Sequence, residues 1–97
     1  PADQRFLQED YPRIVRYRTA AEQLRQAIDQ HDGSRQDLLD SLQSSNPNFW
    51  GAWNLCGDYY VSLGCKEEAR RCWEQALQLE IPREWERLEI ERKIEKL

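Results

Sequence analysis

Three cysteines and one histidine are the residues of this chain best suited to nucleophilic or metal chemistry. Cys56, Cys65 and Cys72 are nine and seven residues apart, and the histidine is His31. A cysteine nucleophile needs a base within hydrogen-bond reach, whereas His31 stands in a polar segment well before the cysteines. A zinc site uses paired ligands such as Cys-x-x-Cys, which do not occur here. We therefore expect no catalytic residue, no metal, no cofactor and no enzyme activity.

The three thiols are expected to differ in reactivity. Cys56 and Cys72 fall on helix faces that should pack against each other. Cys65 falls at a turn before a helix, a placement that favours a reactive thiol. An odd number of cysteines without regular spacing fits a reducing compartment better than a disulfide framework. We expect a cytoplasmic protein, unless a signal lies upstream of Pro1.

The charge of the chain argues against nucleic acid as a partner. Its 97 residues include 14 basic and 18 acidic side chains, for a net charge of −4. Such a chain has no sustained positive field for a phosphate backbone. The one basic cluster, at Arg13, Arg16 and Arg18, is interpreted as a solvated helix face. No apolar run approaches the roughly 18 residues of a membrane span, so we expect no membrane insertion either.

The segment 11–46 is expected to form a pair of helices. Apolar residues recur at spacings of three and four from Ile14 to Ile28, which predicts an amphipathic helix from about Pro12 to about Gln30. Gly33 is expected to break that helix. The second helix would start at Ser34, with Asp37 completing a weakened capping box, and Asn46-Pro47 would end it. Its apolar face would be formed by Leu38, Leu39 and Leu42.

Small and aromatic residues over 49–82 predict two antiparallel helices in close contact. Gly57 is expected to face Ala69 and Ala76, because side chains this small let two helices approach closely. Gly64 is expected to end the first of these helices in a left-handed conformation. The full set comprises Trp53, Cys56, Gly57, Tyr60, Gly64, Ala69, Trp73, Ala76 and Pro82.

This set closely resembles a tetratricopeptide repeat (TPR), in which aromatic and small residues recur in this order at a period of about 34 residues. Two positions depart from the pattern: Cys56 stands where leucine is usual, and Pro82 comes one residue late. The segment 11–46 has the size of a repeat but lacks its small and aromatic residues, so it would be a degenerate one. The resemblance implies an all-α, short TPR-like stack of about five antiparallel helices in a single domain, 1–97.

A capping helix is expected over 83–97. Pro82 would stand in its first turn, and Glu89 with Lys93 would form an ion pair four residues apart. The apolar residues expected to cover the hairpin 49–82 are Trp85, Leu88, Ile90, Ile94 and Leu97.

The resemblance also implies a binding surface for a protein or peptide. In the family, the first helices of successive hairpins line a groove, and Asp58 on this face would favour a basic or neutral ligand. The face lacks the basic residues with which some members hold a C-terminal carboxylate. Exposed aromatic residues would be further anchors. The expected binding residues are Asn54, Asp58, Val61 and Ser62 in the groove, with Phe49 and Trp50 beside it.

Two functions from different classes follow. The first is a non-catalytic protein-protein interaction or scaffold module. The alternative is a helical C-terminal appendage of a larger bacterial enzyme, for example an autoproteolytic acyltransferase-like protein, whose partner would be a linked catalytic domain upstream. Since the chain begins at Pro1 and contains no Met, we expect it to be a fragment of a larger protein.

Overall fold

The computed structural model describes residues 11–97, and this part of the chain folds into α-helices without any strand. The all-α fold class is therefore confirmed. Within the described range no helix is both long and apolar enough to cross a membrane. The helices are α2 (Tyr11–Gln30), α3 (Gln36–Ser45), α4 (Trp50–Ser62), α5 (Lys66–Leu77) and α6 (Glu84–Glu95).

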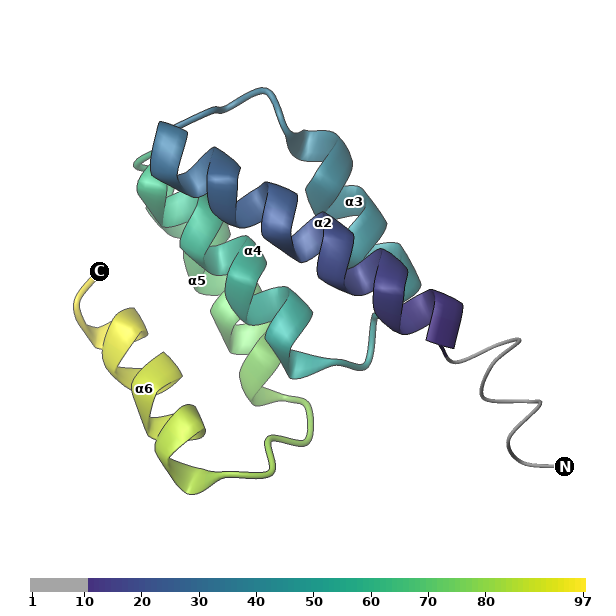
Figure 1. Ribbon diagram of the computed structural model, residues 1–97. Helices are drawn as coiled ribbons and strands as arrows, with labels where there is room; N and C mark the ends of the chain where they lie inside the picture. Colours follow the sequence, from purple (N-terminus) through teal and green to yellow (C-terminus); the bar gives the residue numbers. More distant parts are fainter. Residues whose placement is uncertain (1–10) are drawn as a thin grey trace, which may run out of the picture.

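The helices pack mainly against their neighbours in the chain. α2 contacts both α3 and α4, α4 packs closely against α5, and α5 contacts α6. In Figure 1, α2 and α4 run in the same general direction, and α3 and α5 return behind them. The order is thus a helix pair, a second helix pair and a closing helix. The helices begin and end close to the residues expected from the sequence.

Two groups of buried side chains hold the helices together. The larger joins α2, α3 and α4, with Cys72 added from α5, and its residues on each of the three helices lie on one helical face. The smaller joins α5 and α6 and consists of Ala69, Trp73, Ala76 and Ile90. The larger consists of Ala21, Leu24, Ala27, Leu38, Leu39, Leu42, Ala52, Leu55, Cys56, Tyr59 and Cys72.

The close contact between α4 and α5 places the indole ring of Trp73 over Gly57. A Cβ added to Gly57 would overlap this ring, and the small residues Ala69 and Ala76 are fully buried on α5. The indole Nε1–H donates to the carbonyl oxygen of Asn54 at 3.1 Å. This bond draws the ring into the space that the missing side chain leaves.

The two tight helix ends use different residue types. At Gly64 the expectation is confirmed: φ is 79°, and Cys65 N–H donates to the carbonyl oxygen of Tyr60 at 2.9 Å. α2 ends at Gln30, as expected, but His31 and not Gly33 takes the left-handed conformation there, with φ of 52°. Backbone bonds from His31 and the next residue to the last turn of α2 close this end.

The expected cap of α3 was wrong. Arg35 occupies the N-cap position, and no side chain caps this helix end. The Ser34 hydroxyl donates to the carboxylate of Asp32, and Asp37 binds the guanidinium of Arg35 at 3.1 Å. The connection is held by Tyr59, whose hydroxyl accepts the Arg35 N–H at 3.2 Å and donates to the Asp32 carbonyl oxygen at 2.6 Å.

The closing helix buries only part of its expected apolar face. Ile90 is buried, and Ile94 and Leu97 pack against the same cluster. In contrast, Trp85 is 60% exposed and Leu88 is 41% exposed, so these two side chains lie outside the core. Pro82 precedes the helix instead of standing in its first turn, because Arg83 is the N-cap residue.

The anchoring role of Tyr59 can be tested with Tyr59→Phe. Removing the hydroxyl leaves a carbonyl oxygen and an N–H of the 31–35 connection without their partner, which should lower the free energy of unfolding by about 1 to 3 kcal/mol. Tyr60→Phe is the matched control, since its hydroxyl makes only one exposed, 3.4 Å bond to Gln36. Urea denaturation measures both, and equal midpoints for the two variants would contradict this anchor.

Candidate functional site

A hollow of about 540 Å³ lies between α2 and α4. We call it the α2–α4 hollow. It contains three residues of the expected binding surface, Asp58, Val61 and Ser62, all from α4. The remaining lining residues are Arg25, Ile28 and Asp29 from α2, and Leu55 from α4.

The α2–α4 hollow combines apolar side chains with charges. Ile28, Leu55 and Val61 supply apolar surface, and Val61 is 37% exposed. The rigid helices hold these side chains in place, which suits a small binding site better than a loop would. Such a surface can accept one apolar side chain of a partner while Arg25 and Asp29 contact its polar neighbours.

Sequence reasoning missed the α2 side of this hollow. Ile28 and Asp29 lie three and four residues after Arg25, so the three residues share one face of α2. Ile28 belongs to the apolar periodicity that predicted the helix, but the pattern does not say which neighbour each apolar residue faces. Only the packing of α2 beside α4 brings the two sides together.

Lys93 of α6 binds two of the polar residues expected in the groove, Asn54 and Asp58. Its ammonium donates to Asp58 Oδ1 at 3.0 Å and to Asn54 Oδ1 at 3.2 Å. It also lies 5.7 Å from the centroid of the Trp73 ring. Asn54 is thus engaged within the chain, and the charge of Asp58 is balanced, so the groove is less acidic than expected. The expected bond between Lys93 and Glu89 is not the one that forms.

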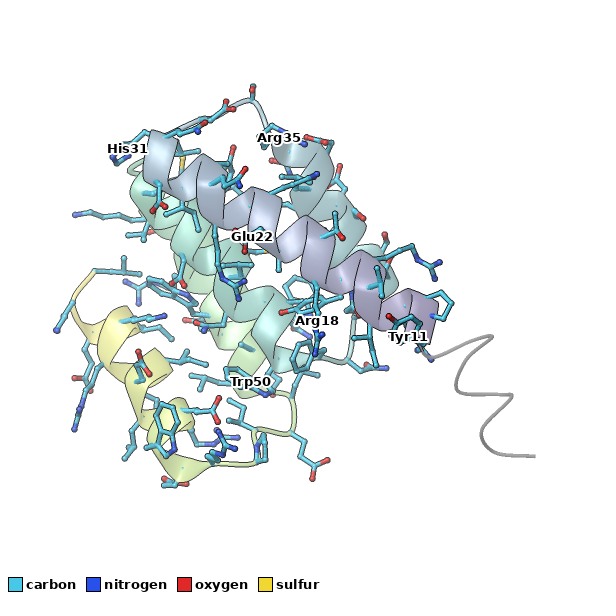
Figure 2. The ribbon with its side chains drawn as sticks, in the orientation of Figure 1. Tyr11, Arg18, Glu22, His31, Arg35 and Trp50 are labelled. Atoms are coloured by element: carbon cyan, nitrogen blue, oxygen red, sulfur yellow. The ribbon has the colours of Figure 1, made fainter. Side chains whose placement is uncertain are left out.

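The aromatic residues Phe49 and Trp50 lie at the opposite end of α4 from Ser62, about 18 Å away at the rise of an α-helix. Phe49 is 42% exposed and makes edge contacts with the rings of Tyr17 and Trp50. Trp50 is only partly exposed and packs against the cluster shared by α5 and α6. Figure 2 shows it at the start of α4, near the connection between α5 and α6. Phe49 remains available for contacts, whereas Trp50 contributes to the fold.

The thiols lie where the sequence placed them. Cys56 and Cys72 are buried and Cys65 is partly exposed. Burial raises the pKa of Cys56 to about 12 and that of Cys72 to about 11. His31 lies at the end of α2, where Nδ1 is 3.0 Å from the carbonyl oxygen of Ser62. Across residues 11–97 no three His, Cys, Asp or Glu side chains are grouped so that they could hold a metal ion.

Comparisons of the chain with protein-family models, with curated proteins and with solved structures find no match. The residues of the α2–α4 hollow and their contacts are therefore the basis on which a function can be proposed.

Thiol labelling tests the packing around Cys56 and Cys72. In the native protein a brief pulse of a maleimide reagent at neutral pH should label Cys65 first, because thiolates react and the two buried thiols stay protonated. Mass mapping of the digested protein measures the order. Rapid labelling of Cys56 would contradict its burial.

The same thiols should make stability fall at high pH. In the unfolded chain cysteine ionises near its ordinary pKa of about 9, whereas the folded values are about 12 and about 11. The stabilisation is complete below pH 9 and is lost as the pH rises through 11 to 12, because unfolding then releases protons. Urea midpoints of wild type and Cys56→Ser across this range measure the effect; the wild type should lose more. Parallel losses in both proteins would argue against it.

Proposed function

We propose that this chain is a non-catalytic protein-interaction module, and that the α2–α4 hollow receives an apolar side chain of a protein or peptide partner. The observation that carries the proposal is the apolar surface of Ile28 and Val61, which lies open between two packed helices above the buried Leu55 and is flanked by charges. Pockets of this kind orient a ligand through a few polar groups and gain affinity from apolar contact.

We further propose that the fold is a short TPR-like stack. Support comes from the sequence resemblance over 49–82 together with the order of a helix pair, a second pair and a closing helix. The contact of Trp73 with Gly57 gives two residues of the motif a joint mechanical role. In such a stack α2 and α4 are the first helices of successive hairpins, and their shared face is where the partner would bind.

The charges around the hollow favour a neutral or basic segment as the ligand. Asp29 and Asp58 both line it, and Arg25 is the only cation among its lining residues. Lys93 balances Asp58, so that carboxylate is partly committed. A ligand with an apolar side chain next to a basic one would place its charge near Asp29.

A second candidate function is a permanently docked helical appendage of a larger enzyme. The first half of α2 favours it, because Tyr11, Ile14 and Val15 are 52%, 39% and 42% exposed there. A further domain would cover such side chains and gain from their burial. A catalytic domain encoded upstream of Pro1 would decide for this function. For either function, the three free thiols lead us to propose a reducing compartment such as the cytoplasm.

Selection of displayed peptides on the folded chain, followed by calorimetry, tests the interaction module. Enriched peptides should share an apolar residue and should bind Val61→Arg at least about tenfold more weakly, since the long cation fills the hollow. Val15→Arg is the matched control: Val15 is similarly exposed but does not line the hollow. Its affinity should stay within about twofold, and both variants should keep the wild-type urea midpoint.

Two results would overturn the proposal. One is the absence of peptides that bind this chain better than they bind an unrelated helical protein. The other is equal binding of the enriched peptides to wild type and Val61→Arg.

A further inference from the structure

The exposed side of α6 carries a second hollow, of about 530 Å³, that the proposed peptide site does not use. Its lining residues are Trp85, Glu89, Arg92, Lys93 and Lys96. Lys93 is the residue that reaches Asp58, and Asp58 lines the α2–α4 hollow. The two hollows therefore adjoin at this ion pair, with its atoms 3.0 Å apart.

Two neighbouring stripes of α6 differ in charge. Trp85, Glu89, Arg92 and Lys96 are spaced four, three and four residues apart and share one face, which we call the α6 basic stripe. Glu84, Leu88, Glu91 and Glu95 have the same spacing one position earlier and form an acidic stripe beside it.

The cations of the basic stripe have no partner within the described chain. Neither Arg92 nor Lys96 forms an ion pair inside residues 11–97. Cations in the last turn complement the helix dipole, which gives Arg92 and Lys93 a structural role. The dipole gives no reason for Trp85, which stands in the first turn of the same stripe and is 60% exposed. A large indole beside unpaired cations is the composition of an interaction surface, because Trp and Arg dominate interface energetics.

We propose that the α6 basic stripe docks an acidic protein segment that carries an apolar side chain. The acidic residues would pair with Arg92 and Lys96, and the apolar side chain would cover Trp85. Because the stripe adjoins the α2–α4 hollow, this extends the proposed function, on which it rests, to a partner with acidic as well as neutral or basic parts.

A narrow segment fits the stripe better than an extended anionic surface does. Glu84, Glu91 and Glu95 lie along the neighbouring stripe of the same helix, Glu89 lies within the basic stripe itself, and the chain carries a net charge of −4. A membrane or nucleic acid would bring these carboxylates close to further negative charge, which costs binding free energy. An acidic segment the width of one chain can pair with Arg92 and Lys96 at one end of the stripe and pass Glu89 with its uncharged part.

Fluorescence anisotropy with a defined peptide tests this docking surface. The probe is a short fluorescein-labelled peptide of Glu and Ser around one central Phe, titrated with the full chain at low salt. It should bind, and the same peptide with Gln in place of every Glu should bind at least about tenfold more weakly. Because Trp85 is the proposed anchor for the apolar side chain, Trp85→Ala should weaken binding of the acidic peptide by roughly thirtyfold.

Charge reversal provides the matched comparison. Arg92→Glu with Lys96→Glu should weaken binding of the acidic peptide by roughly tenfold or more. The control is Lys66→Glu with Arg71→Glu, which changes the net charge equally on the exposed side of α5 and should change the affinity by less than about twofold. Circular dichroism should show each variant folded in the assay buffer, since none of these side chains is buried. The Arg92→Glu pair should lower the urea midpoint slightly, because it removes a cation that complements the dipole of α6.

Several results would overturn the proposal: equal binding of the Glu and Gln peptides, equal loss in both charge-reversed pairs, or binding to phosphatidylserine vesicles but not to the peptide. Self-association of the chain that requires Trp85 would assign the stripe to a second copy instead. Val61→Arg should leave the acidic peptide unaffected, so failure at α6 is distinguishable from failure at the α2–α4 hollow.

Discussion

The insertion of the Trp73 ring over Gly57 is the contact on which much of this fold depends. The ring fills space that any side chain at position 57 would occupy, and its Nε1–H is bonded to the carbonyl oxygen of Asn54. The bond satisfies the polar end of an indole that is otherwise buried. The ring therefore sets how closely α5 packs on α4 and which face of α4 is turned toward α5.

The closing helix depends on the same ring. Ile90 is buried in the cluster that contains Trp73, and the Lys93 ammonium lies over the indole while it binds Asp58 and Asn54. Asn54 thus takes part twice, through its carbonyl oxygen to Trp73 and through its side chain to Lys93. One site on α4 therefore sets the position of both α5 and α6. This is also why the closing helix covers polar residues that the sequence had placed in an open groove.

The sequence predicted the helices well and the contacts between them poorly. Apolar spacing located α2 and α3, and Gly64 marked the end of α4, because these signals act within one or two turns of the chain. The end of α2 near Gln30 was predicted, but the left-handed conformation of His31 was not, since a non-glycine residue adopts it only when its surroundings favour it. For Lys93, local spacing pointed to Glu89, but a carboxylate on another helix was better placed. The α2 half of the hollow was missed for the same reason, because it exists only once two helices lie side by side.

The residues that form the core differ from those that line the two hollows. Within residues 11–97 the buried core consists of apolar side chains, and no charged residue is fully buried. The charges that line both hollows can therefore change without leaving an unpaired charge in the core, which is the change that costs most. Asp58 and Lys93 are the exception, because they line different hollows and also hold α6 against α4. A partner that draws either side chain away weakens this link, so the two surfaces are joined through the attachment of α6 and not through the core.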